Sequence, residues 1–211
     1  WARENTRDEV FGALTRKEAY ATTGPRMRVR IFGGWDFSED DLGSPDFVSE
    51  GYTRGVAMGG DLTNAPEGAS PSIMVRAMRD PDGANLDRVQ VIKGWIDAAG
   101  DTSERVYDIA VSGERVIGAD GRAREPVGNT VDIENATFTN TIGAAALEGV
   151  WKDPDFDPSE NAFYYVRVIE IPKPRWTTYD AAFFDIPLPD TVPAITQDRA
   201  YTSPIWYTPG E

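Results

Sequence analysis

The sequence predicts a mainly β protein, an antiparallel β-sandwich preceded by a short N-terminal helical segment. Residues 27–32 alternate apolar and basic side chains, the period-two pattern of a strand with one buried face. Further short strand-like segments are separated by turn sequences such as Asp80-Pro81-Asp82-Gly83 and Ala119-Asp120-Gly121. Short strands with recurrent turns are typical of a sandwich, whereas alternating βαβ units would require long helical segments between the strands.

The first 20 residues are the one segment with a helical pattern. Thr6 followed by Glu9 fits a capping box at a helix N-terminus. A single apolar stripe follows on this helix, formed by Val10, Phe11 and Leu14. Thr15 and Glu18 repeat the capping-box spacing, which predicts a second short turn of helix before Gly24-Pro25 ends the segment.

The rest of the chain is expected to form strands and loops. We expect strands at Met27–Phe32, Ser72–Arg79, Val89–Ile96, Arg105–Val111, Thr130–Thr139, Ala146–Trp151, Phe163–Ile171 and Tyr201–Tyr207. The acidic stretch Asp36–Asp46 is predicted to be an exposed loop. Proline cannot donate to a central ladder, so Pro172–Pro193 is predicted to cross the sheet face as an ordered excursion.

Composition limits the possible functions. The 211 residues contain 21 Lys and Arg against 35 Asp and Glu, and the resulting net charge of −14 disfavours nucleic acid as a partner. No apolar stretch approaches the roughly 20 residues of a membrane-spanning helix. The chain has neither Cys nor His, which removes thiolate nucleophiles and the side chain most used in zinc sites and acid–base catalysis. We therefore expect no catalytic centre and no cofactor in this chain.

Two acidic clusters are candidate metal sites. Asp153, Asp155 and Asp157 occupy alternate positions, and their oxygens could converge on a hard cation such as calcium. The spacing does not follow the EF-hand pattern, and a pair of Asp-Pro turns is the simpler explanation. Asp80 and Asp82 form a second candidate pair, in a sequence that also fits a hairpin turn.

Aromatic and basic residues suggest a binding or interdomain surface. Trp35 lies in the acidic loop, and Trp176, Tyr179, Phe183 and Phe184 lie in the Pro-rich segment. Such aromatics bind sugars or bury contacts between domains, and we favour the interdomain role. Arg167 and Arg175 could fix the sandwich to its neighbour or face a substrate, although ordinary ion pairs explain them too. Lys93, next to Trp95, is expected to cover the surface with its stem.

Several segments together resemble a known family. The segments 32–37, 79–87, 91–95, 151–157, 164–168, 174–180 and 199–207 are similar to the family called domain of unknown function 3604. Residues 5–26 resemble the closing helix and loop of PHP-like metallohydrolases. The resemblance implies a large metal-binding hydrolase-type domain followed by a C-terminal β domain, often exported by bacteria. In PHP-like proteins the divalent metals are held by His and acidic residues ahead of this helix.

The resemblance divides the chain into two parts. Residues 1–25 would be the tail of a PHP-like catalytic domain that is missing from the sequence, consistent with an initial Trp in place of Met, and residues 26–211 an accessory β domain. The expected function is non-catalytic: the β domain packs on its own N-terminal catalytic domain, which carries the divalent metal, and helps to shape its cleft. The resemblance also implies an exported or periplasmic protein, and it leaves the substrate open.

Two other functions remain open. The chain could be a carbohydrate- or calcium-binding module that uses Trp35, Trp176 or the loop from Asp153 to Asp157. Alternatively, its aromatic residues could pair subunits in an oligomer.

Overall fold

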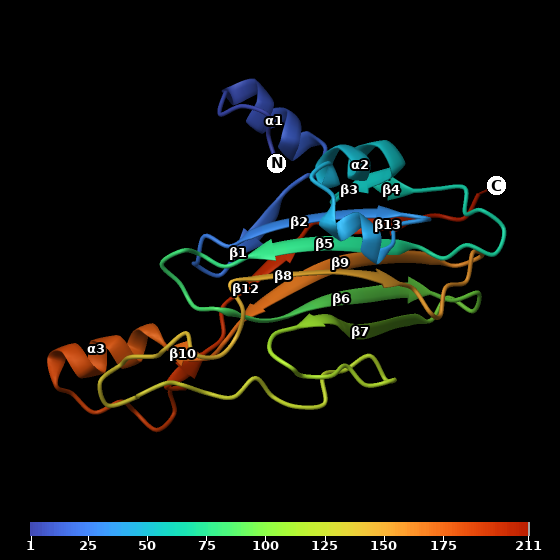
Figure 1. The fold of residues 1–211 in the computed structure, drawn as a ribbon. Coiled ribbons are helices and arrows are strands. Elements are labelled where there is room, and N and C mark those ends of the chain that lie inside the picture. Colours follow the sequence, from blue (N-terminus) through green and yellow to red (C-terminus); the bar gives the residue numbers. More distant parts are fainter. Residues whose placement is uncertain (211) are drawn as a thin grey trace.

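The computed structural model describes residues 1–210 and shows two β-sheets packed face to face (Figure 1). In the first sheet the strand order is β3 (Gly55–Ala57), β2 (Arg28–Gly34), β5 (Ser72–Met78) and β8 (Ala146–Lys152), all antiparallel. The predicted mainly β class with antiparallel sheets is therefore confirmed.

The second sheet is built around β9 (Asn161–Glu170). On one side β9 pairs with β6 (Leu86–Ile96), which in turn pairs with β7 (Thr102–Val111). Successive parts of β9 also pair with β12 (Arg199–Thr202) and β13 (Ile205–Tyr207). The outermost strands of this sheet are β1 (Tyr20–Thr22) beside β12 and the parallel β4 (Asp61–Leu62) beside β13.

Residues 1–210 form three α-helices and one 3₁₀ helix outside the two sheets. They are α1 (Arg7–Thr15), the 3₁₀ helix η1 (Glu39–Gly43), α2 (Phe47–Arg54) and α3 (Trp176–Phe184). Figure 1 shows α2 close to the first sheet, whereas α1 and α3 extend away from the sandwich in different directions. A two-stranded ribbon of β10 (Lys173–Pro174) and β11 (Ile195–Thr196) adjoins α3. None of the helices among residues 1–210 is long and apolar enough to cross a membrane.

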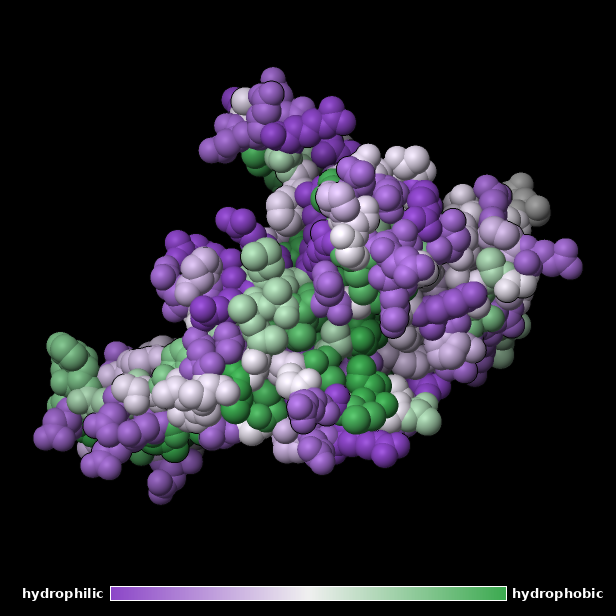
Figure 2. All heavy atoms as spheres, viewed as in Figure 1, coloured by the Kyte–Doolittle hydropathy of each residue, from purple (hydrophilic) through white to green (hydrophobic). Residues whose placement is uncertain are grey.

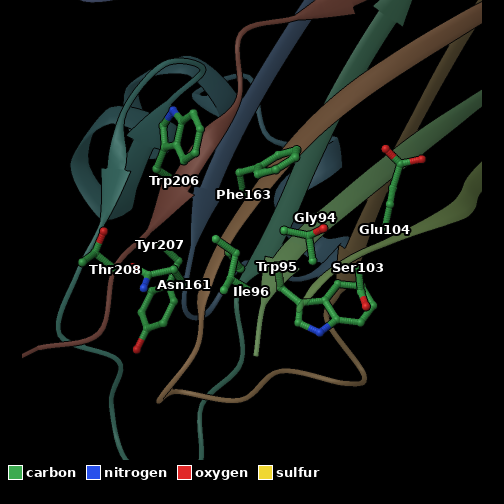
Figure 3. Close-up of a pocket in the computed structure, with 12 residues that line it drawn as sticks. Gly94, Trp95, Ile96, Ser103, Glu104, Asn161, Phe163, Trp206, Tyr207 and Thr208 are labelled. Carbon is green, nitrogen blue, oxygen red and sulfur yellow. The ribbon is translucent and has the colours of Figure 1, made fainter. Parts of the chain in front are cut away.

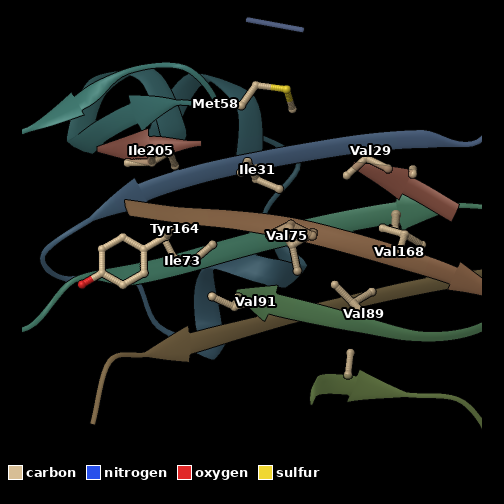
Figure 4. Packing of buried hydrophobic residues seen from close by; sticks show 14 of the residues in the cluster. Val29, Ile31, Met58, Ile73, Val75, Val89, Val91, Tyr164, Val168 and Ile205 are labelled. Carbon is tan, nitrogen blue, oxygen red and sulfur yellow. The ribbon is translucent and has the colours of Figure 1, made fainter. Parts of the chain in front are cut away.

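The core fills the space between the sheets because alternate residues of each strand point inward. Val29, Ile31 and Val75 from the first sheet pack with residues such as Val91 and Val168 from the second (Figure 4). Each fully buried aliphatic side chain stabilises the fold by about 1.5–3 kcal/mol relative to an exposed one. Arg28 and Arg30, the basic residues expected on the other face of β2, lie outside this core.

A second, smaller core covers the outer face of the first sheet. Phe32 and Met74 point to this side and pack with Phe37 and Phe47, which come from the segment containing η1 and α2. Asp36–Asp46 were predicted to be an exposed loop; most of these residues are exposed, but the segment forms η1, and its Phe37 and Asp41 are buried. Asp41 is buried and forms an ion pair with Arg54, so one of the acidic side chains of this segment takes part in the packing.

The N-terminal helix begins as predicted. Thr6 caps α1, because its side chain accepts a hydrogen bond from the backbone N–H of Glu9 at 3.4 Å. The predicted second helical turn is wrong: Lys17 adopts a left-handed conformation (φ 59°) and the chain enters β1. Glu18 is a buried partner of Arg16 and Tyr52 and does not cap a helix.

Three other predictions are corrected. Thr130–Thr139 is not a strand but a turn closed by the Asp132–Thr137 bridge, because the Asp132 side chain accepts hydrogen bonds from Asn135. The single strand expected at Tyr201–Tyr207 is split at Ser203-Pro204 into β12 and β13. The Pro-rich segment holds the helix α3 between its prolines and extends away from the sandwich instead of crossing the sheet face (Figure 1).

The division of the chain at residue 25 stays a prediction, although one strand of the sandwich, β1, lies ahead of it. Tyr20–Thr22 form β1 and pair with β12, so this part of the predicted tail is continuous with the sandwich.

Candidate functional site

The aspartates of the loop after β8 are bound by neighbouring side chains. Lys93 Nζ lies 2.7 Å from Asp153 Oδ2, and the Tyr164 hydroxyl donates to the same oxygen at 2.7 Å. Lys93 also donates to the Asp155 carbonyl at 2.7 Å. Lys93 is only 2% exposed, so the prediction of a surface lysine is wrong. Burial, together with the negative charge of Asp153, raises the pKa of Tyr164.

The other two carboxylates of this loop, those of Asp155 and Asp157, also accept hydrogen bonds. Asp155 Oδ2 accepts from Arg105 at 2.7 Å and from the Tyr107 hydroxyl at 3.0 Å. Asp157 accepts from the backbone and side chain of Ser159, and these hydrogen bonds lower the pKa of Asp157. Calcium would have to compete with these partners, and metal binding here remains a prediction that the contacts do not favour.

The Asp80–Asp82 pair is bound to Arg26. The Arg26 backbone N–H donates to Asp80 Oδ2 at 2.7 Å, and its guanidinium lies 2.6 Å from Asp82 Oδ2. The backbone N–H groups of Arg26 and Asp82 are the main cause that lowers the pKa of Asp80 to about 2. This arrangement joins the start of β2 to the turn after β5. Within residues 1–210 we find no group of three or more acidic side chains placed to hold a metal ion.

The predicted aromatic residues lie in separate places. Trp35 is half-buried and packs against Phe156 and Tyr207, with ring centroids 5.9 Å away in both cases. Trp176 and Tyr179 are exposed on α3, where Arg175 lies 5.8 Å from the Trp176 ring. Trp35 and Trp176 therefore do not form one platform. Trp35 is part of the sandwich packing, whereas Trp176 is exposed to solvent.

Arg167 belongs to a polar network on the outer face of the second sheet. Its Nε donates to Gln90 Oε1 at 2.8 Å, and Gln90 Nε2 donates to Asp108 Oδ1 at 2.6 Å. All three residues lie on neighbouring strands of that sheet. A structural role accounts for these contacts.

The apolar stripe of α1 faces solvent. Val10, Phe11 and Leu14 are all exposed, with Phe11 reaching 70% exposure, and Ala13 is the one buried residue of the helix. The α3 helix is similar, because Phe183 is 82% exposed and its ring contacts Phe184 edge to face at 4.9 Å. Figure 2 shows apolar side chains at the end of the molecule where α3 extends from the sandwich.

Sequence analysis missed a groove on the outer face of the second sheet. Trp206, Phe163, Gly94 and Glu104 lie side by side on β13, β9, β6 and β7, and they line a cavity of about 480 Å³ (Figure 3). These residues are far apart in the sequence, so no local motif marks them. The only sequence signal was the alternation of aromatic residues at 163 and 165 along a predicted strand.

Sequence analysis also missed a buried carboxyl group at the end of β9. Glu170 is fully buried, and burial is the main cause that raises its pKa to about 7. Lys173 Nζ lies 3.4 Å from Glu170 Oε2 but only 2.6 Å from Asp198 Oδ2. The only sign of this buried carboxyl group in the sequence was the charged Glu170 between two isoleucines, Ile169 and Ile171.

Comparison with known proteins gives one match. The family model described as "Protein of unknown function (DUF3604)" matches residues 1–209. A search of curated proteins and a search of solved structures find no match. The family match covers nearly the whole chain and agrees with the resemblance found in the segments around Trp35, Trp151 and Trp206. The chain therefore belongs to the DUF3604 family.

Proposed function

We propose that this chain is the non-catalytic β domain of a larger metal-dependent hydrolase with a PHP-like catalytic domain. In this proposal the apolar side chains of α1 and α3 pack against that catalytic domain. The divalent metal and the reacting groups belong to the catalytic domain, and the sandwich supports it and helps to shape its cleft.

The observation that carries this proposal is the exposed apolar stripe of α1. A helix of nine residues is marginally stable in water unless it packs on another element. Here the residues that should pack, Phe11 and Leu14, are directed to solvent, and Ala13 is the one buried residue of the helix. A helix with this pattern is suited to an interface with a further domain.

The α3 helix supports the same role. It extends from the sandwich on the β10–β11 ribbon, and its exposed residues include Trp176, Phe183 and Phe184. Aromatic side chains are enriched in the buried centres of protein interfaces. Two separate apolar helices on one rigid sandwich would allow the domain to hold a neighbour at two points.

The composition agrees with a supporting role. The sequence contains no His and no Cys, so a metal-dependent hydrolase would need its imidazole ligands from elsewhere. In this proposal residues 5–26 are the end of a PHP-like domain, whose metal ligands would lie ahead of α1.

A hydrolysis assay tests the proposal. We expect the longer polypeptide to hydrolyse bis(p-nitrophenyl) phosphate or p-nitrophenyl acetate when Mn²⁺ or Zn²⁺ is added, and this chain alone to show no turnover. Turnover by this chain alone, at a rate comparable to the longer polypeptide, would reject a non-catalytic role.

A double variant tests the docking surface. Phe11→Ser with Leu14→Ser should lower the melting temperature of the longer polypeptide, because the interface would lose apolar burial, and should leave the melting temperature of the isolated chain nearly unchanged. Val116→Ser is the matched control, since Val116 is exposed but lies far along the chain from both helices. Equal effects of the double variant on both proteins would count against docking through α1.

A further inference from the structure

The groove on the outer face of the second sheet has the composition of a sugar-binding site. We propose that it binds a neutral saccharide, with Trp206 and Phe163 as the stacking platform. This inference is independent of the docking role proposed for α1 and α3, because the groove lies on the sandwich itself.

The platform is a pair of aromatic rings in contact. Trp206 and Phe163 are directly opposite on β13 and β9, and their ring centroids are 5.4 Å apart at an interplanar angle of 52°. Trp206 is 43% exposed, which is unusual for so large an apolar side chain on a sheet. Tyr165 continues the aromatic surface along β9, with its ring nearly parallel to that of Phe163 at 6.5 Å.

Gly94 allows the Phe163 ring to take this position. It lies directly opposite Phe163 on β6, and a Cβ at residue 94 would overlap that ring. Glu104 lies opposite Gly94 on β7, on the other side of Gly94 from Phe163. Figure 3 shows Phe163 beside Gly94, with Glu104 further along the same face.

Polar groups surround the aromatic surface. Thr102, Asn161 and Thr208 line the cavity and are exposed, so their hydroxyl and amide groups are available to a ligand. The face of a pyranose ring carries C–H groups that stack on an aromatic ring, while its hydroxyl groups need donors and acceptors at the edge. The groove offers both kinds of contact in one cavity of about 480 Å³, within the usual size range of a small-molecule site.

Charge makes an anionic ligand unfavourable in this cavity. Among the described residues that line the cavity there is a single carboxylate, Glu104, and no Lys or Arg. With a net charge of −14 on the chain, an anionic ligand would be repelled.

A quaternary ammonium ion would need aromatic faces on several sides. The neighbouring rings do not provide such a cage. Lys93 Nζ already lies 5.1 Å from the centroid of the Trp95 ring, and Tyr207 is buried with its hydroxyl bonded to the Pro158 carbonyl. Trp206 and Phe163 lie against each other, so they present one continuous aromatic surface and not faces on several sides.

Isothermal titration calorimetry with neutral oligosaccharides of glucose, mannose, xylose and galactose tests the proposal. We expect at least one of them to bind the chain at millimolar concentration. Trp206→Ala should weaken that binding about tenfold or more. Trp206→Tyr should retain most of it, because it restores an aromatic face.

Trp176→Ala is the matched control, because it removes another exposed tryptophan, from α3, and should leave the affinity unchanged. Circular dichroism confirms that each variant is folded. The proposal is overturned if no oligosaccharide of the panel binds, or if Trp206→Ala binds as well as the parent. It is also overturned if tetramethylammonium binds in place of the sugars. A fourth contrary outcome is concentration-dependent self-association in sedimentation that disappears in Trp206→Ala, because the groove would then be covered by a second copy.

Discussion

Lys93 and Asp153 form a buried ion pair that fixes the loop after β8 to the second sheet. Both side chains are almost completely buried, at 3% and 0% exposure, and Tyr164 adds a hydrogen bond to the same carboxylate. Breaking one side of such a pair leaves an uncompensated charge in the interior, which typically costs about 3–5 kcal/mol. Among contacts between single residues, we therefore expect the loss of this pair to lower the free energy of unfolding the most.

We predict that Lys93→Met lowers the free energy of unfolding by about 3–5 kcal/mol in urea denaturation. Arg105→Ala is the control, because Arg105 on β7 pairs with Asp155 of the same loop. These two side chains are 45% and 53% exposed, so the loss of their ion pair should cost about 1 kcal/mol or less. Similar losses for the two variants would show that the Lys93–Asp153 pair is not stabilised by burial in the way we describe.

Glu170 should make the stability of the protein depend on pH in a range where few other groups titrate. Its pKa is raised to about 7 in the folded protein from an ordinary value of 4.5, and histidine is absent from the chain. A protonated Glu170 favours the folded state, so its stabilising effect is complete below pH 4.5 and is lost as the pH rises to about 7.

We predict that the free energy of unfolding of the parent protein decreases between pH 5 and pH 7.5, and that Glu170→Gln flattens this part of the curve. The variant should be at least as stable as the parent above pH 7, because it buries a neutral side chain. Thermal unfolding in buffers across this range measures both. An unchanged slope in the variant would assign the pH dependence to other groups.

At the residue scale the sequence predicted the turn that contains Asp153 and Asp155, but it did not predict which residues these aspartates contact. Asp153-Pro154-Asp155 was recognisable as a turn because Asp and Pro have local backbone preferences. The partner Lys93 is 60 residues earlier in the chain, and its burial depends on the pairing of β6 with β9. Residue-scale contacts of this kind follow from the assembled sheets and cannot be read from local pattern.

At the scale of elements, two helical glycines have opposite roles. Gly51 in α2 lies so close to Phe32 that a Cβ would overlap the Phe32 ring. Gly12 in α1 has only the flexible end of the Arg16 side chain nearby, at 3.3 Å from the position of a Cβ. The first glycine is needed for packing on the sheet, whereas the second only weakens its helix.

We predict that Gly51→Ala destabilises the protein by about 1–3 kcal/mol through overpacking. Gly12→Ala should instead increase the helical signal in circular dichroism and stabilise α1 by about 0.5–1 kcal/mol. If Gly51→Ala were neutral or stabilising, α2 would not pack on Phe32 as closely as described.

The strands were more predictable than the helices. Residues 27–32, 72–79 and 146–151 show clear alternation or apolar content, and all became strands of the first sheet. The helix α2 was hidden in a Gly-rich and acidic region, because its two buried residues, Phe47 and Gly51, include only one apolar side chain and so give no helical period of apolar residues. The α3 helix was hidden because prolines on both sides suggested an irregular segment.

At the scale of the whole molecule, the sandwich and its family could be predicted, but the groove could not. Class and family follow from strand patterns and from motifs that span the chain. The groove combines Trp206, Phe163 and Glu104 from three strands, and their proximity depends on the order β13, β9, β6 and β7. Strand order is a property of the folded chain, and local patterns carry little information about it.

The central claim is that α1 packs against a catalytic domain in the longer polypeptide. Hydrogen exchange of the α1 amides, followed by mass spectrometry on both proteins, tests this claim most directly. We predict that residues 7–15 exchange rapidly in this chain alone and become strongly protected in the longer polypeptide, while β6 and β9 are protected in both. Equally rapid exchange of residues 7–15 in the two proteins would contradict the claim.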